Sequence, residues 1–264
     1  MKIGIIGLGI VGSAVDYGLR MLGHKTYPHD IKLNTTVNDV IDTEICYICV
    51  PTPESATGQC DVSIVKTVVK ELVDNSYEGI IAIKSTVVPG TTSELQKLYP
   101  FSKFCFVPEF LRERCAIADF VENHDLCIIG TNDTNIFETI KKSHGKYPKH
   151  FEMLDIKEAE LCKYFNNVYN ATLITFANSF YEICKGLGVD YTTIKNAITK
   201  REKIADVYLE CNENMRGFGG VCLPKDTAAL DSLAKELNID VDFFRTIITE
   251  NKKYKTTVFK GMRI

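Results

Sequence analysis

The sequence lacks the features that mark several classes of protein. It has no apolar stretch of the ~18 residues that a membrane-spanning helix needs. Its formal net charge is -3, without the basic excess of a protein that wraps nucleic acid and without a run of like charge. It contains no internal repeat and no low-complexity segment. We therefore expect neither a membrane nor a nucleic acid as a partner.

The spacing of the cysteines excludes two further classes. The chain has 10 cysteines, but no Cys/His spacing resembles a zinc site, so no metal is expected. Several lie in apolar runs, where a small hydrophobic side chain packs in a strand: Cys46, Cys49, Cys105 and Cys127. This indicates reduced thiols in a cytoplasmic protein. The start MKIGIIGLGIVG has the lysine and apolar residues of a signal peptide, but its glycines and the early Asp16 favour a buried strand.

The first half of the chain alternates short apolar runs with segments of helical spacing. We predict strands at 2–7, 25–30, 43–50, 79–86, 103–108 and 125–130, and helices at 11–22, 61–75, 91–99 and 132–145. Asp61 is expected to cap its helix, and Gly145 to close the last one. Strand and helix alternating this often predict an α/β fold, a Rossmann-type doubly wound parallel sheet.

The second half is predicted to be mainly α-helical. Asp155 and Glu158 have capping-box spacing, and about thirty residues without proline or internal glycine follow them. Further helices are expected at 190–200, 224–237 and 242–255. We place the first domain at residues 1–155 and the helical second domain at 156–264. A helix this long with apolar residues on several faces needs partners, so we expect a homodimer through Glu158–Lys185.

A glycine fingerprint opens the first domain. GLGIVG supplies Gly7, Gly9 and Gly12 around Ile10 and Val11, between a predicted strand and a predicted helix. In that context the glycines allow a tight turn and the close approach of a pyrophosphate to the helix N-terminus. The acidic residue expected about twenty positions later is Asp30, whose carboxylate would accept the ribose hydroxyls and repel a 2′-phosphate. NAD is therefore the expected cofactor, although Lys32 nearby leaves NADP open.

Three other predicted strands also end in unusual segments. CVPTP follows the third strand, KSTVVPGTT the fourth and VPEFLRERC the fifth. Ligands gather beyond the carboxyl ends of the strands in a sheet of this kind. From the first two segments we expect cofactor contacts at Val50, Pro51, Thr52, Ser85 and Thr86.

With EAELCKYFNN (158–167) and GFGGVCLPKD (217–226) following in the same order, the chain resembles the UDP-glucose/GDP-mannose dehydrogenase family over nearly its whole length. The resemblance implies an NAD-dependent enzyme that oxidises the C6 alcohol of a nucleotide sugar, UDP-glucose or GDP-mannose, to the uronic acid. It also implies two hydride transfers without release of the aldehyde. The PEFLRE form (108–113) is similar to that of members acting on 6-hydroxy sugars.

The resemblance also assigns roles to residues. Cys222 is implied to be the nucleophile that holds the sugar as a thiohemiacetal and then as a thioester. Lys163 and Asn167 are implied to contact the substrate and to stabilise negative oxygen in the intermediates. Asp226 is implied to position or deprotonate water, and Thr86 to belong to the same water network. Glu113 is implied to take part in thioester hydrolysis. Further substrate contacts are implied for Glu109, Phe110, Leu111, Arg112, Phe218, Gly219 and Lys225.

Two departures from the family pattern matter. The chain stops where members usually continue into a C-terminal nucleotide-binding domain, which we expect to be truncated away or supplied by a separate chain. Met215 and Arg216 stand where the family tends to have a proline–glycine pair. Arg216 either reaches a phosphate or is a solvated loop charge. Because of the first alternative, it is included among the candidate substrate contacts.

Two other functions stay open from the sequence. One is an NAD-binding regulatory or inactive module that has lost the nucleotide-sugar site. The other is a β-hydroxyacid dehydrogenase, which also has a first α/β domain followed by a long helix. Those enzymes use a lysine and need no cysteine, so Cys222 in its glycine-rich segment argues against them.

Overall fold

The computed structural model describes residues 1–55 and 58–256. Contacts within the chain divide it into two units, which are described separately below. The first unit contains Met1–Pro53 and Asp61–Lys163, and the second contains the described residues of 54–60 and those from Tyr164 onward. Helix α6 (Ile156–Leu187) begins in the first unit and continues in the second, and the short segment Glu54–Cys60 groups with residues far from it in sequence.

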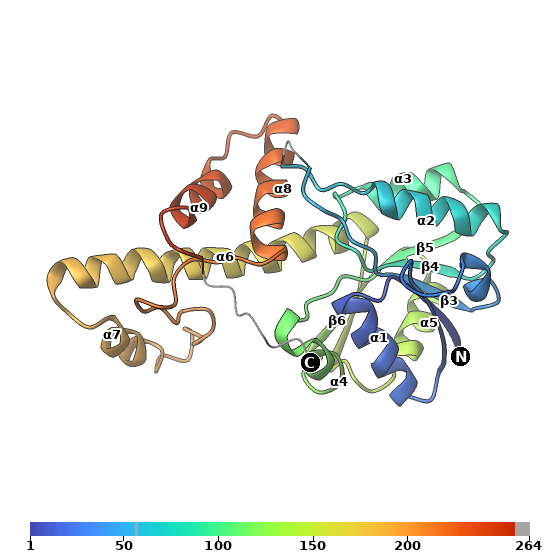
Figure 1. The fold of residues 1–264 in the computed structure, drawn as a ribbon, viewed down its shortest axis with the longest axis horizontal. Coiled ribbons are helices and arrows are strands. Elements are labelled where there is room, and N and C mark those ends of the chain that lie inside the picture. The colour runs from blue at the N-terminus through green and yellow to red at the C-terminus, as the bar shows by residue number, and fades with distance from the viewer. Residues whose placement is uncertain (56–57, 257–264) are drawn as a thin grey trace. The chain divides into compact units, whose positions relative to one another are not determined.

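The first unit is built on a seven-stranded sheet (Figure 1). Its order is β2-β1-β3-β4-β5-β6-β7, and every pair is parallel except β5 and β6. The predicted Rossmann-type sheet is thus confirmed, while the antiparallel pair and the seventh strand were not predicted. The strands are β1 (Lys2–Ile6), β2 (Lys25–His29), β3 (Ile45–Ile48), β4 (Ile80–Ile83), β5 (Lys103–Phe106), β6 (Leu126–Gly130) and β7 (His150–Leu154).

Both faces of this sheet are covered. Along β3, Cys46 and Ile48 belong to one hydrophobic cluster, and Ile45 and Tyr47 belong to another. Successive side chains of a strand point to opposite faces, so the two clusters are the cores on the two sides of the sheet. Strand β2 lies at an edge, where the missing N–H of Pro28 breaks no inner ladder.

Helices connect most of the strands. Asp133 caps α5 by accepting hydrogen bonds from the amides of Asn135 and Ile136, and Gly145 ends it as predicted. Asp61 accepts the Ser63 amide at 2.8 Å, but the N-cap position itself is Val62, one residue later than predicted. The α-helices are α1 (Ile10–Met21), α2 (Ser63–Asp74), α3 (Thr91–Leu98), the unpredicted α4 (Ala116–Val121) and α5 (Thr134–His144), with 3₁₀ turns η1 (Val37–Val40) and η2 (Glu113–Cys115).

The second unit is helical, as predicted. The start of α6 lies in the first unit, where the Asp155 amide donates to Glu158 at 3.1 Å, as in the predicted capping box. The Asp155 carboxylate accepts the Lys157 amide at 2.9 Å, one residue before the amide that a full capping box uses. The remaining helices are α7 (Tyr191–Ile198), α8 (Cys222–Glu236) and α9 (Phe243–Asn251). Helix α8 begins two residues before its predicted start, which places Cys222 in the first helical turn and not in the preceding loop.

Among the described residues, no helix combines the length and the apolar character needed to cross a bilayer.

Candidate active site

The glycine loop of the first unit has the geometry that a pyrophosphate requires. Gly7 has φ +92°, and a Cβ there would lie 2.7 Å from the Cys49 carbonyl oxygen. A Cβ at Gly12 would lie 1.8 Å from the Gly7 carbonyl oxygen, so only glycine fits either position. At Gly9, by contrast, a Cβ would meet nothing within 4 Å, which leaves open space at the N-terminus of α1. The loop therefore fits an anionic ligand approaching its backbone.

Asp30 joins the end of β2 to this loop. One carboxylate oxygen accepts the Leu8 amide at 2.7 Å, and the other accepts the Lys32 amide at 2.9 Å. These two backbone hydrogen bonds lower the pKa of Asp30 and keep it ionised. A fixed carboxylate beside the glycine loop suits ribose hydroxyls, each oxygen having a lone pair to spare.

The ends of β3 and β4 lie at the same edge of the sheet because these strands are parallel neighbours. The Ser85 hydroxyl donates to the Val50 carbonyl at 2.7 Å and so ties the two strand ends together. Of the other predicted cofactor contacts here, Pro51 is exposed, Thr52 is buried and Thr86 is half-buried. Ile10 and Val11, the first two residues of α1, are exposed and half-buried, respectively. All of these residues flank the carboxyl edge of the sheet, where such folds bind ligands.

A buried ion pair follows β5. The Lys84 ammonium lies 3.5 Å from the Glu109 carboxylate, whose second oxygen accepts the Leu111 amide at 2.7 Å. Lys163 donates to the Glu109 carbonyl oxygen and lies 5.8 Å from the centroid of the Phe110 ring. The structure therefore brings together four predicted residues and Lys84, which sequence reasoning missed. A lysine at the end of the buried run IIAIK was the available signal.

Two predicted residues nearby have other surroundings. The Arg112 guanidinium forms a two-pronged contact with Asp119, with donor–acceptor distances of 2.9 and 2.6 Å. The Asp119 pKa is lowered because Arg112 outweighs the opposing effect of burial. Glu113 is exposed in η2.

The second unit holds a buried polar network between α6 and α8. Asp226 is fully buried and accepts hydrogen bonds from the Asn167 amide at 2.5 Å and from Lys225 at 2.6 Å. The Lys225 ammonium also lies 3.9 Å from the Cys60 sulfur. Burial alone lowers the pKa of Lys225, but Asp226, Cys60 and Cys222 outweigh it and raise that pKa, so the lysine stays charged.

Cys222 stands at the edge of this network. It is the first residue of α8 and lies one turn before Asp226 on that helix. Cys222 is exposed, whereas the other nine cysteines of the chain are buried or half-buried. An accessible thiol one helical turn from a charge-bearing carboxylate and close to an ammonium group is suited to nucleophilic work. The side chains of Asn167, Lys225 and Asp226, three of the predicted site residues, meet here.

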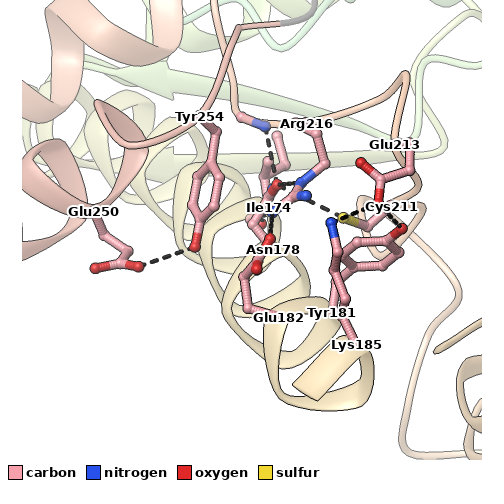
Figure 2. A network of polar contacts seen from close by, with 11 residues as sticks. Ile174, Asn178, Tyr181, Glu182, Lys185, Cys211, Glu213, Arg216, Glu250 and Tyr254 are labelled. Carbon is pink, nitrogen blue, oxygen red and sulfur yellow. Dashed lines mark hydrogen bonds and ion pairs between the residues drawn. The ribbon is translucent and has the colours of Figure 1, made fainter. Parts of the chain in front are cut away.

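The segment before α8 is held by side chains that the sequence did not single out (Figure 2). Arg216 is buried, with its guanidinium bonded to Asn178 and Glu182, so it is not a solvated charge. Phe218 packs in a hydrophobic cluster of the second unit, and Gly219 is half-buried. An asparagine inside a helix gives no sequence signal, which is why Asn178 was missed.

Within the part of the chain that the structure describes, no three His, Cys, Asp or Glu residues are grouped as a metal site would require.

Two models of one family match the chain. The NAD binding domain of the UDP-glucose/GDP-mannose dehydrogenase family matches residues 26–147, and the central domain of the same family matches residues 157–253. The chain belongs to this family. Its first matched domain is an NAD-binding domain, so the cofactor is NAD, as predicted. The glycine loop at 7–12 precedes the matched range.

Individual relatives agree with this membership. The chain is 31% identical over 243 residues to a UDP-glucose 6-dehydrogenase of Bacillus subtilis, covering 88% of this chain and 50% of that one. It is 31% identical over 232 residues to a UDP-glucose 6-dehydrogenase of Rickettsia bellii, covering 84% and 52%. The chain thus spans about half the length of these curated relatives.

Solved structures give the same picture. A UDP-glucose dehydrogenase of Pyrobaculum islandicum superposes with a TM-score of 0.87 at 25% identity, covering 96% of this chain and 68% of that one. A 3-hydroxyisobutyrate dehydrogenase of Mycobacterium tuberculosis superposes with a TM-score of 0.76, covering 96% and 92%. Its identity is 13%, so this second likeness shows a shared fold alone.

Proposed function

We propose that this chain carries out the NAD-dependent oxidation of the C6 alcohol of a nucleotide sugar, UDP-glucose or GDP-mannose, to the uronic acid. The observation that carries the proposal is the exposed Cys222 at the start of α8, beside the buried Asn167–Asp226–Lys225 network. An enzyme that stopped at the aldehyde would need no nucleophile, whereas oxidation to an acid without releasing the aldehyde does.

Cys222 acts as the nucleophile between the two oxidations. Its thiolate adds to the aldehyde carbon, forming a C–S bond, and the former carbonyl oxygen takes up a proton. The resulting thiohemiacetal still carries the C–H bond that the second oxidation breaks, which leaves a thioester. Water then adds to the thioester carbon, the C–S bond breaks, and the acid leaves with the thiol restored. Bound NAD supplies the hydride acceptor for each oxidation.

The surrounding charges suit the oxygen in these steps. The ammonium of Lys163 and the amide of Asn167, one turn apart on α6, would stabilise an oxyanion in the intermediates. Asp226 is held by two donors, so its carboxylate is fixed in place to orient or deprotonate water. Glu113 and Thr86 would assist thioester hydrolysis. The exposed side chain of Glu113 leaves it accessible to a substrate.

The proposal includes a homodimer through α6. Large apolar side chains stand exposed along this helix at spacings of three, four and seven residues, and these spacings place them on one face: Phe165, Tyr169, Phe176, Phe180, Ile183 and Leu187. A stripe of this size on a surface helix is typical of an interface with another chain. A cytoplasmic location also belongs to the proposal, because none of the ten cysteines is in a disulfide.

The decisive experiment compares the wild-type chain with Cys222→Ser in NAD reduction with UDP-glucose and with GDP-mannose. We expect two NADH per uronic acid from the wild type and no net acid from the variant. Cys162→Ser, which removes a half-buried thiol of α6, should behave like the wild type. Full acid production by Cys222→Ser would overturn the mechanism. Calorimetry that detects NAD binding but no binding of either nucleotide sugar would instead favour an NAD-binding module.

A further inference from the structure

Arg216 occupies an aromatic sandwich in the second unit (Figure 2). Its guanidinium carbon lies 4.7 Å from the centroid of the Tyr181 ring and 4.5 Å from that of Tyr254. In its plane, Nε donates to Asn178 at 2.8 Å and a terminal nitrogen donates to Glu182. Both faces and two edges of the group are therefore engaged by protein, which is the geometry of a structural cation and not of a ligand-binding one.

Two buried asparagines hold the backbone on the C-terminal side of Arg216. The side-chain oxygen of Asn178 accepts the Gly217 amide at 3.1 Å as well as Arg216 Nε. Asn251 accepts the Phe218 amide and donates to the Phe218 carbonyl, both at 2.8 Å. Gly217 has φ +55°, and a Cβ there would lie 3.0 Å from the Asn251 side-chain oxygen. The residues 216–218 are thus fixed by side chains from α6 and α9, not by a regular element.

Arg216, Asn178 and Asn251 together form a clamp on the backbone at residues 216–218, and this clamp lies just before the nucleophile Cys222. From Phe218 the chain passes through Gly219 and Gly220 and enters α8 at Cys222, four residues after the last clamped position. Glycine supplies no side chain to hold this short passage, so its direction is set by its anchored ends. One anchor is the Arg216–Asn178–Asn251 clamp, and the other is the first turn of α8.

We propose that Arg216 is a positioning residue: with Asn178 and Asn251 it fixes the glycine passage and so sets where Cys222 meets the substrate. The inference rests on the proposed function and deepens it. It also assigns Arg216 a role other than contact with a substrate phosphate. Tyr254 belongs to the same device, because it supplies one of the two rings that enclose the guanidinium.

The test uses two matched pairs of variants in the full chain. Arg216→Met removes the cation, and Lys185→Met removes a surface cation of the same network, paired at 2.9 Å with Glu213. Tyr254→Leu removes a ring from the sandwich, whereas Tyr254→Phe keeps the ring and loses only the hydroxyl that donates to Glu250 at 3.1 Å. The measurements are kcat and KM for the nucleotide sugar, and hydrogen exchange of the Gly217 and Phe218 amides.

We expect Arg216→Met to lower kcat by ~10-fold to ~100-fold, because small misplacements of a reacting group have effects of that order. KM should change by less than threefold, and both amides should exchange faster. Tyr254→Leu should also lower kcat and speed the exchange of both amides, by smaller factors. For Tyr254→Phe and Lys185→Met, we expect kcat and KM within twofold of the wild type.

Two results would overturn the inference. A large rise in KM at unchanged kcat would make Arg216 a substrate ligand. Unchanged amide exchange in both Arg216→Met and Tyr254→Leu would show that the clamp does not hold the loop. If the wild-type chain oxidised neither nucleotide sugar, the proposed function would fail, and amide exchange would still decide whether Arg216 holds residues 216–218.

Discussion

At the scale of single residues, Asp226 is the most constrained charge of the candidate site. It is fully buried between Asn167 and Lys225, and Lys225 is itself buried. In Asp226→Asn the Lys225 ammonium would lose its counter-charge inside the protein, which typically costs about 3–5 kcal/mol of unfolding free energy. Urea unfolding followed by circular dichroism measures this. Asp231→Asn removes the charge that pairs with the exposed ammonium of Lys235 on the same helix and should cost about 1 kcal/mol or less.

Equal losses in these two variants would show that burial of the Lys225–Asp226 pair is unimportant. That result would remove the reason for placing a fixed carboxylate beside Cys222.

Gly9 separates cofactor binding from folding at a single position. Its backbone needs no positive φ, and a Cβ there meets no atom within 4 Å, so Gly9→Ala should leave the unfolding temperature unchanged. The added methyl group would stand in the open space at the N-terminus of α1, where the proposed cofactor site places the pyrophosphate. We expect NAD affinity, measured by calorimetry, to fall by ~10-fold or more. Gly186→Ala, at another open position in α6, should bind NAD normally.

At this scale the sequence alone predicted those site residues that belong to a recognisable motif. Gly7, Gly12 and Asp30 were predicted from a spacing whose physical cause is local, namely a tight turn and a helix N-terminus. The clamp residues Asn178 and Asn251 were not predicted, because each becomes informative only when it meets a backbone amide 33 to 39 residues away in the chain. The roles of Cys222 and Lys163 came from family resemblance, since a lone cysteine or lysine has no signature of its own.

At the scale of elements, the exposed face of α6 gives a direct test of self-association. Phe176→Glu places a charge in the middle of the apolar stripe defined above and should convert a dimer to a monomer in light scattering after size-exclusion chromatography. Lys185→Glu adds the same charge to an exposed position outside the stripe and should leave the dimer intact. A monomeric wild type, or a dimer that survives Phe176→Glu, would contradict the proposed interface.

Elements were predictable where their periodicity was strong. The buried strands β1 and β3–β6 read as apolar runs, and the 32 residues of α6 carry no proline. Strand β7 was missed because its exposed and half-buried side chains give no apolar run. The reversal between β5 and β6 was missed because strand direction depends on pairing across the sheet, which a single run does not encode. The start of α8 was missed because glycines and Pro224 mask its first turn.

At the scale of the whole molecule, three histidines concentrate acid sensitivity in the first unit. His144 is fully buried, and its ring lies 5.8 Å from those of His124, Phe120 and Tyr47. Burial lowers the pKa of His144 well below the ordinary 6.5, and the charge of Lys84 adds to this. Burial likewise lowers the pKa values of His124 and His24. At neutral pH each of these rings is therefore uncharged in the folded state.

The sign of the pH dependence follows from these lowered values. Above pH 6.5 the folded and unfolded chains both carry neutral histidines, so these rings add no pH dependence. Below pH 6.5 the histidines bind protons in the unfolded chain but not in the folded chain, so the unfolding free energy falls as the pH falls. A fully buried ring such as His144 contributes a slope of about 1.4 kcal/mol per pH unit.

Circular dichroism is the suitable signal for this measurement, since the chain has no tryptophan. We expect the unfolding free energy of the wild type to drop steeply between pH 6.5 and the lower pKa of the folded rings. His144→Asn should be less stable at neutral pH. Its unfolding free energy should change less steeply with pH, because one of the three histidines with a lowered pKa is gone. NAD binds the same unit and should raise its unfolding temperature at every pH. Because the proposed cofactor site is at the strand ends and not at the histidines, the slope should remain. An unaltered slope in His144→Asn would show that carboxylates, and not the buried histidines, govern acid unfolding.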